Sequence, residues 1–223
     1  MIILPVRPSI LLKDKLPWVH SSLKTVYYVC IAKYLLFFGR KSQKAETSKA
    51  YLRRVRENFY VNFISGRGLD IGYGGDLVHP TATGYDFEHG DAQFLNNIDN
   101  ACFDYVYSSH TLEHLFDPSL ALYNWWRVLR PNGFLILYLP DRQLYEKKEA
   151  LPSNWNLDHK HFFDLYIDIL PDTLGVIPLI ERSITNYRII YAKICDENYV
   201  SISSDHHSQG EYSIEVVLQK VSC

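Results

Sequence analysis

The most constraining feature of the sequence is the nine-residue run GLDIGYGGD at residues 68–76. Leu69 and Ile71 are typical of a buried strand, because a parallel strand that is covered on both faces is a continuous apolar run. The three glycines that follow predict a tight turn, which lets the backbone approach a ligand closely. Parallel α/β sheets bind nucleotides at a glycine turn directly after the first strand. The run therefore predicts an α/β fold with a nucleotide-type ligand at this turn.

The glycine spacing argues against a dinucleotide as that ligand. The dinucleotide fingerprint would require glycines at positions 72, 74 and 77 of this chain, but position 77 is Leu77. The glycine that packs the following helix against the strand is therefore missing. The chain also lacks a Tyr-x-x-x-Lys pair in a suitable place, so a nucleotide-sugar oxidoreductase is disfavoured.

Four further segments narrow the class of ligand. TGYD at 83–86 predicts a second short strand that ends in an acid, and GDA at 90–92 predicts a loop beside it. FDYVYSSHTLEHL at 103–115 and RVLRPNGFLIL at 127–137 follow. Together with the glycine run, these segments resemble the motifs of the class I S-adenosylmethionine-dependent methyltransferases, in particular small bacterial proteins of the methyltransferase type 11 kind. The resemblance is close over residues 60–140 and looser elsewhere.

The resemblance implies S-adenosylmethionine as the cofactor, together with a set of residues that bind it. Gly72 and Gly74 would lie against its methionine part, and Asp86 would hold the ribose, since a carboxylate accepts two hydrogen bonds from a diol. Asp91 and Ala92 would frame the adenine. The full set implied by the matching motifs is Asp70, Gly72, Tyr73, Gly74, Gly75, Asp86, Phe87, Asp91, Ala92, Ser108 and Ser109.

The resemblance also implies a Rossmann-like class I methyltransferase sheet whose last strand is antiparallel. Residues 211–220 suit that strand, paired with a strand within 187–203. Only fifteen residues separate Asp70 from Asp86, and Pro80 interrupts them, so the early helices must be shortened or absent. One face of the sheet then needs another cover. We assign residues 1–45 to an N-terminal helical extension and 46–223 to the methyltransferase domain.

Residues 22–39 look helical and strongly apolar. A membrane-spanning helix needs about 20 apolar residues, whereas Lys33 interrupts this shorter segment. We therefore expect the segment to pack against the domain, where it would cover the sheet, or against a second subunit in a homodimer. Membrane contact through 22–39 is the less favoured alternative. Residues 42–50 are polar and indicate a linker or the start of a helix.

Composition excludes several classes of function. The formal net charge of −2 offers no basic footprint for nucleic acid. The four cysteines have no paired short spacing, which is typical of reduced thiols and not of a disulfide framework or a zinc site. We expect a cytoplasmic enzyme whose partner is a small-molecule acceptor.

Three histidines are candidates for the proton acceptor in catalysis. His110 follows the strand whose end faces the reactive methyl group in this fold, and an imidazole suits proton transfer at neutral pH. Its alternative role is to orient the loop. His159 and His161 are rival bases in a loop that should line the acceptor pocket or cap a helix beginning near Phe163. No metal site is expected there, because neither a cysteine nor a second carboxylate pair accompanies these histidines.

The residues around these histidines carry the remaining expectations. We interpret Glu113 as holding the first amides of a helix, and His114 as pairing with backbone or with a carboxylate. The loops LPDRQLYE at 139–146 and WNLDHKHFF at 155–163 resemble methyltransferases that act on sugars of bacterial surface polysaccharides or on secondary metabolites. We expect O-methylation of a sugar or another small hydroxylated molecule. The alternatives are N-methylation of an amino sugar and a non-catalytic, methyltransferase-like interaction subunit.

Overall fold

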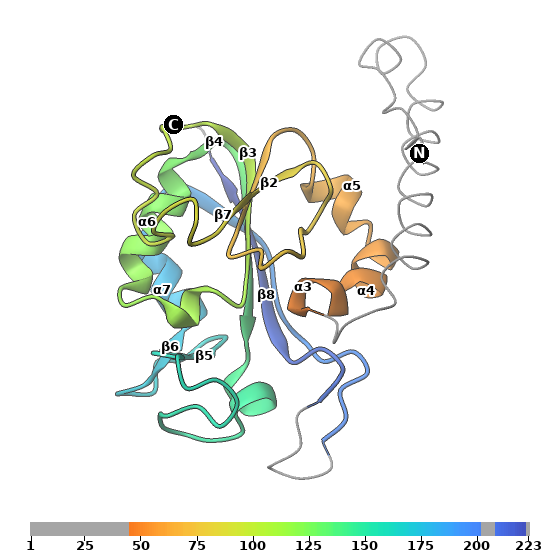
Figure 1. Ribbon diagram of the computed structural model, residues 1–223, viewed down its shortest axis with the longest axis vertical. Helices are drawn as coiled ribbons and strands as arrows, with labels where there is room; N and C mark the ends of the chain where they lie inside the picture. Colours follow the sequence, from red (N-terminus) through yellow and green to blue (C-terminus); the bar gives the residue numbers. More distant parts are fainter. Residues whose placement is uncertain (1–44, 202–207, 222–223) are drawn as a thin grey trace.

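The computed structural model describes residues 45–201 and 208–221. Six strands form one sheet in the order β2-β1-β3-β4-β8-β7 (Figure 1). Strands β1 to β4 run parallel, while β8 is antiparallel to both of its neighbours, β4 and β7. This mixed sheet with an antiparallel last strand confirms the expected fold class. The strands are β1 (Gly68–Ile71), β2 (Ala82–Tyr85), β3 (Phe103–Ser109), β4 (Leu129–Pro140), β7 (Tyr187–Cys195) and β8 (Ser213–Lys220).

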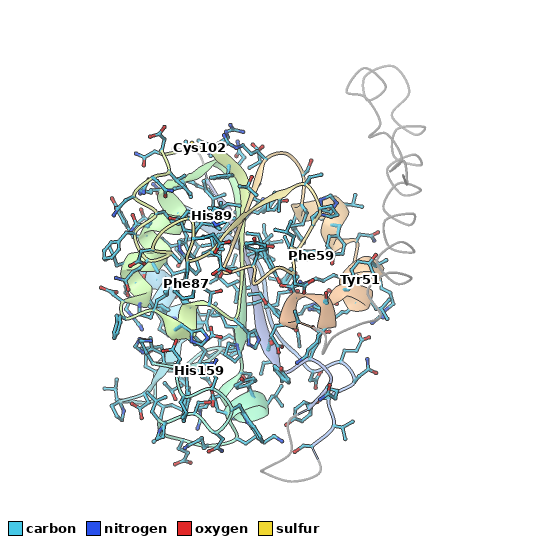
Figure 2. The ribbon with its side chains drawn as sticks, viewed as in Figure 1. Tyr51, Phe59, Phe87, His89, Cys102 and His159 are labelled. Atoms are coloured by element: carbon cyan, nitrogen blue, oxygen red, sulfur yellow. The ribbon has the colours of Figure 1, made fainter. Side chains whose placement is uncertain are left out.

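Helices cover both faces of the sheet (Figure 1). On one face lie α6 (Pro118–Arg127) and α7 (Val176–Ser183), and on the other lie α3 (Glu46–Lys49), α4 (Tyr51–Arg56) and α5 (Phe59–Phe63). Figure 2 shows Tyr51 and Phe59 on the latter side. The remaining elements are the 3₁₀ helix η1 (Leu112–His114), the π-helix η2 (Arg142–Glu146) and a small parallel pair, β5 (Phe162–Asp164) with β6 (Thr173–Gly175).

The two faces of the sheet follow from the alternation of side chains along its strands. In β4, Leu135, Leu137 and Leu139 pack into the hydrophobic core beneath α6 and α7. Ile136 and Tyr138 point the other way, into a second core that includes residues of α5. An uninterrupted apolar run is therefore required, because both faces of this strand are covered.

The second face differs from the first because buried ion pairs connect its helices to the sheet. Arg54 of α4 is fully buried, and its Nε donates to Glu215 of β8 at 2.7 Å while Nη1 donates to the hydroxyl of Tyr107 at 2.9 Å. Arg53 bridges Glu211 and Glu215. Each buried charge is thus paired, as burial demands. These contacts tie α4 to the sheet.

The early helices are absent, as expected. Within the described ranges, no helix lies between β1 and β2 or between β2 and β3. In the described part of the chain, α3, α4 and α5 (residues 46–63) cover the sheet face that these missing helices would leave open (Figure 1). The expectation that 22–39 covers this face lies outside the residues the structure describes. The start of α3 at Glu46 confirms a helix start within 42–50.

The expectation of a helix beginning near Phe163 is wrong. Phe162 and Phe163 form the short strand β5, and both side chains are fully buried. Their backbone pairs with β6, which lies about ten residues further along the chain, so tertiary pairing overrides the local pattern. None of the helices in the described part of the chain is long and apolar enough to cross a membrane.

Candidate functional site

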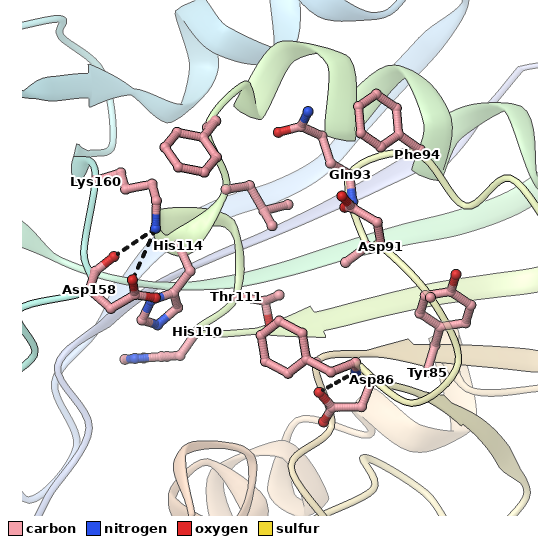
Figure 3. A pocket seen from close by; sticks show the side chains of 16 residues that line it. Tyr85, Asp86, Asp91, Gln93, Phe94, His110, Thr111, His114, Asp158 and Lys160 are labelled. Carbon is pink, nitrogen blue, oxygen red and sulfur yellow. Dashed lines mark hydrogen bonds and ion pairs between the residues drawn. The ribbon is translucent and has the colours of Figure 1, made fainter.

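A cavity of about 930 Å³ opens where β1, β2 and β3 end (Figure 3). Ligands of open α/β sheets bind outside the carboxyl ends of the strands, so the cavity lies where the glycine run predicted a ligand. Figure 3 shows Tyr85 and Asp86 at one end of the cavity and Asp158 and Lys160 at the other. The lining residues are Gly72, Tyr85, Asp86, Phe87, Gly90, Asp91, Ala92, Gln93, Phe94, His110, Thr111, His114, Leu115, Phe116, Asp158 and Lys160.

The three glycines of the turn have different reasons to be glycine. A Cβ on Gly72 would overlap the Thr111 side chain, whose Oγ1 would lie 2.0 Å away. Gly74 and Gly75 have φ of +55° and +84°, which other residues rarely adopt. No atom lies within 4 Å of the position that a Cβ would take on either of them. Gly72 also has a positive φ of +70°, so all three positions favour glycine, but only Gly72 is additionally required by packing, whereas Gly74 and Gly75 keep an open space beside the turn.

Asp86 follows β2 and lines the cavity. Its Oδ2 accepts a hydrogen bond from the Gly74 N–H at 3.0 Å, and its Oδ1 accepts one from the Phe87 N–H at 2.9 Å. A carboxylate has about four lone-pair sites, so it can still accept from a ligand diol. The Asp86 side chain therefore links the glycine turn after β1 to the end of β2.

Asp91 and Ala92 line the same end of the cavity. Asp91 Oδ1 accepts from the Gln93 N–H at 2.7 Å, which closes the loop back on itself. Phe87, which Figure 2 labels, lines the cavity and is 95% exposed. An apolar ring held in the open beside two carboxylates suits a flat heterocycle with polar edges.

Three other cofactor candidates, Asp70, Ser108 and Ser109, are buried and do not line the cavity. Asp70 is fully buried, and its Oδ2 accepts from the Val78 N–H at 2.6 Å. Burial raises the pKa of Asp70 to about 8, although that hydrogen bond acts in the opposite direction. The Ser108 hydroxyl donates to the Ile71 carbonyl at 3.1 Å. The candidates that do not line the cavity are Asp70, Tyr73, Gly74, Gly75, Ser108 and Ser109.

Of the three candidate bases, only His110 lines the cavity. It adopts a φ of +47° directly after β3, and its Nε2 lies 2.9 Å from the Ser213 hydroxyl. His159 is buried behind the wall, with its Nδ1 2.5 Å from Glu146 Oε1. His161 also lies outside the lining, and burial lowers its pKa.

The far end of the cavity is built by the loop after β4. His114 Nδ1 lies 3.0 Å from Asp158 Oδ2, and Lys160 Nζ lies 3.1 Å from Asp158 Oδ1. The first contact confirms that His114 pairs with a carboxylate. Asp158 and Lys160 line the cavity, so this loop contributes to the pocket, as expected.

The interpretation of Glu113 is wrong. Its side chain is fully buried, and neither carboxylate oxygen accepts a hydrogen bond from another residue in the described part of the chain. The segment is a single turn of 3₁₀ helix, so no N-terminal row of amides is available to its carboxylate. Burial raises the pKa of Glu113 well above its usual range.

Several residues that line the cavity were not predicted as site residues from the sequence, namely Gln93, Phe94, Thr111, Leu115, Phe116 and Lys160. Each lies within a few positions of a residue that a motif did identify. Their proximity to the motifs was the available signal. Loop residues that flank a strand end point into such a cavity when the loop folds over it.

The cavity fits S-adenosylmethionine by chemistry as well as by size. Pockets for small molecules and cofactors measure about 300–1,000 Å³. Gly74 and Gly75 do not line the cavity themselves, but Asp86, which does, accepts a hydrogen bond from the Gly74 N–H and offers further acceptors for a diol. Asp91 offers acceptors for an amine on the same side.

Comparisons with known proteins agree with this geometry. The model of a family described as methyltransferase domain matches residues 17–137. No curated protein sequence matches the chain. Solved structures share the fold at low identity. The cyclase SpnF is 12% identical with a TM-score of 0.50, and the alignment covers 82% of this chain and 86% of that one.

Two solved methyltransferases are similar at the same level. A protein from Thermotoga maritima, described as an S-adenosylmethionine-dependent methyltransferase and possible histamine N-methyltransferase, is 16% identical with a TM-score of 0.48. That alignment covers 86% of this chain and 96% of the other. An S-adenosylmethionine-dependent methyltransferase from Archaeoglobus fulgidus is 18% identical with a TM-score of 0.49, over 84% of this chain and 99% of the other.

Proposed function

We propose that this chain, which belongs to the methyltransferase domain family and uses S-adenosylmethionine as its cofactor, methylates a hydroxyl of a sugar or another small molecule. The family establishes methyl transfer. The acceptor is our inference, as is its place in the synthesis of surface polysaccharides or secondary metabolites.

The observation that carries the proposal is the division of the cavity into two ends. Asp86 and Asp91 lie at the end that suits the cofactor, while His110, Asp158 and Lys160 lie at the other. One cavity of about 930 Å³ thus has room for a small acceptor beside the cofactor. Methyl transfer needs the two held together in one orientation, and positioning alone supplies much of the rate.

The acceptor end suits a polyhydroxylated molecule. Asp158 accepts hydrogen bonds and Lys160 donates them, so hydroxyl groups find both kinds of partner there. Phe116 and Leu157 are largely exposed beside these residues and offer apolar surface. A sugar ring has hydroxyl edges and apolar C–H faces, so it complements both features.

We propose that His110 accepts the proton of the attacking hydroxyl. When bound, S-adenosylmethionine supplies a methyl group that its sulfonium already activates. The chain must therefore orient the hydroxyl and remove its proton. His110 lines the cavity, and the contact of its Nε2 with the Ser213 hydroxyl fixes the ring plane. His159 and His161 lack this access to the cavity.

Screening nucleotide sugars and small hydroxylated metabolites for added methyl groups by mass spectrometry tests the acceptor class. We expect methyl on oxygen. Methyl found only on the nitrogen of an amino sugar would overturn the O-methylation proposal. No transfer to any hydroxylated acceptor, with cofactor bound, would point to the interaction-subunit alternative.

Replacing His110 with Ala tests the proton acceptor. We expect affinity for S-adenosylhomocysteine to stay within a few-fold, whereas turnover falls by about 10²–10⁴, the usual contribution of a general base. His161→Ala is the matched comparison, because His161 lies outside the cavity lining. If His161→Ala were inactive and His110→Ala fully active, the base would belong to the 156–163 loop. Loss of cofactor binding in His110→Ala would instead assign His110 to the shape of the loop.

A further inference from the structure

Glu113 lies between histidines without any hydrogen bond to them. Its side chain is 0% exposed, and among the described residues no other residue donates to either carboxylate oxygen. We propose that Glu113, His114 and His159 form a binding site for a divalent transition-metal ion. The site lies at the acceptor end of the cavity, outside the region that suits the cofactor.

The distances define the site. His114 Nε2 and His159 Nε2 each lie 3.9 Å from Glu113 Oε1, and His110 Nδ1 lies 3.7 Å from the same oxygen. These separations exceed hydrogen-bond length. The ligand atoms of Glu113, His114 and His159 all lie within 4.8 Å of one another. Two atoms that bind one zinc ion tetrahedrally at about 2.0–2.1 Å lie about 3.3–3.4 Å apart, so side-chain shifts of up to about 1.5 Å complete the arrangement.

The outer nitrogen of each imidazole is held by a carboxylate. His159 Nδ1 lies 2.5 Å from Glu146 Oε1, and His114 Nδ1 lies 3.0 Å from Asp158 Oδ2. Because a carboxylate only accepts, the proton of each neutral ring belongs on Nδ1, and the lone pair of Nε2 then faces Glu113. A carboxylate behind each histidine is the arrangement that orients metal-ligating imidazoles.

Without a cation, three hydrogen-bond acceptors point toward one another at this site. Two imidazole lone pairs and a carboxylate oxygen converge in a buried place, which is unfavourable for all of them. A proton on one group would relieve a single contact at most. A divalent cation between the three groups satisfies all of them at once, and it stabilises the charged form of Glu113, which burial alone disfavours.

The ligand set selects the kind of ion. Two imidazole nitrogens with one carboxylate oxygen suit Zn²⁺ and its first-row neighbours, whereas Mg²⁺ and Ca²⁺ prefer oxygen ligands throughout. His114 and Asp158 also line the cavity, so the open coordination position faces the acceptor end. Cation binding does not depend on which acceptor the enzyme uses.

The test uses the full chain, treated with a chelator, dialysed and titrated with Co²⁺ in the absence of cofactor and acceptor. We expect visible d–d absorption that saturates at one Co²⁺ per chain and disappears when Zn²⁺ displaces it, but not when Mg²⁺ is added. Absence of Co²⁺ binding by the folded wild-type chain would overturn the proposal. That result would leave the proposed methyl transfer untouched, since no reaction is measured.

Variants assign the ion to this site. Glu113→Gln and His159→Gln should each weaken Co²⁺ binding by at least about 10–100-fold, the range known for changes around metal ligands. His161→Gln is the matched control from the same loop and should bind as the wild type does. Circular dichroism checks the fold, and His114→Gln replaces a variant that unfolds, because its side chain is partly exposed.

A second control tests whether other histidines of the chain bind the Co²⁺ ion. His206 and His207 lie side by side in the sequence, outside the described residues. A variant with both replaced by Ala should retain the absorption. If this variant lost the absorption while Glu113→Gln and His159→Gln kept it, the ion would belong to residues 206–207 and the proposal would be wrong.

Discussion

At the scale of single residues, two acids of the cofactor motifs occupy opposite environments. Asp86 lines the cavity and holds the turn through the Gly74 N–H. Asp70 is fully buried behind that turn, where the Val78 N–H is its hydrogen-bond donor. The same side chain is therefore available to a ligand in one position and is part of the scaffold in the other. The difference follows from burial, which disfavours the charged form.

We predict that Asp86→Ala weakens binding of S-adenosylhomocysteine by about 1.5–3 kcal/mol, the range for hydrogen bonds to a charged group. Isothermal titration calorimetry measures this change. Asp99→Ala is the control, because Asp99 is exposed and lies outside the cavity lining. A loss below a few tenths of a kcal/mol would move the ribose site elsewhere.

Asp70 gives a prediction with a defined pH window. Its folded-state pKa is raised from 3.8 to about 8. Between these values the unfolded chain has released the proton and the folded chain retains it. The free energy of unfolding therefore falls as pH rises, by up to about 1.4 kcal/mol per pH unit.

Asp70→Asn removes this dependence, because the amide stays neutral at every pH in the window. Urea unfolding at several pH values should show the stability difference between variant and wild type growing in favour of the variant from pH 4 to pH 8. A difference that stays constant with pH would mean that Asp70 is ionised in the folded protein.

At the scale of elements, α4 is fixed to β8 by buried ion pairs. Arg54 and Glu215 are both fully buried and lie 2.6 Å apart at their closest charged atoms. Although burial acts to raise it, the pKa of Glu215 is lowered from 4.5 to about 2, because Arg54 and Arg53 outweigh that effect. This pair connects the short helices to the one face of the sheet that lacks early crossover helices.

We predict that Glu215→Gln destabilises the protein by about 3–5 kcal/mol at neutral pH, because it leaves the Arg54 charge buried without its partner. Urea denaturation measures the loss. Glu57→Gln is the control, since the Glu57 carboxylate is exposed and its ion pairs with Arg53 and Lys193 lie at the surface end of the network, where such pairs contribute about 0–1 kcal/mol.

The pH dependence of the same pair has the opposite sign to that of Asp70. A depressed carboxyl pKa contributes stability that is fully present above the unfolded value of 4.5 and is lost as pH falls toward 2. The wild type should therefore lose more stability than Glu215→Gln on acidification through this window. Equal losses in both proteins would show that Glu215 is not held ionised by the arginines.

At the scale of the whole molecule, ligand binding and folding are coupled. The glycine turn, the loop after β2 and the segment after β3 all contribute to one cavity, so a ligand there connects elements that are far apart in the sequence. A ligand that binds only the folded state stabilises it by about 2.7 kcal/mol at a hundredfold excess over Kd.

We predict that saturating S-adenosylhomocysteine raises Tm by about 5–11 °C, given about 2–4 °C per kcal/mol for a chain of this size. NAD at the same concentration should give no shift, because Leu77 stands where the dinucleotide fingerprint needs glycine. Thermal scans monitored by tryptophan fluorescence measure both. An equal shift with NAD would contradict the assignment of the cofactor.

The sequence by itself determined the features that depend on a few neighbouring residues. The glycine turn after β1, the acid after β2 and a strand within 211–220 follow from local patterns, and all are present, whereas the antiparallel direction of that last strand came from the resemblance to the methyltransferases. Asn132, which precedes Gly133 before the apolar half of β4, has a φ of +65°. Such conformations are set by the backbone preferences of the residues themselves.

Only the tertiary structure determined which side chains meet. The sequence near His159 did not indicate Glu146 or Glu113 as its neighbours, yet folding brings Glu146 to 2.5 Å and Glu113 to 3.9 Å. The described cover of the second sheet face by residues 46–63 was likewise not expected. Helical and strand periodicity specify which face of an element is apolar, but not which distant segment packs against it. Convergence of buried polar groups therefore appears only when the elements are assembled.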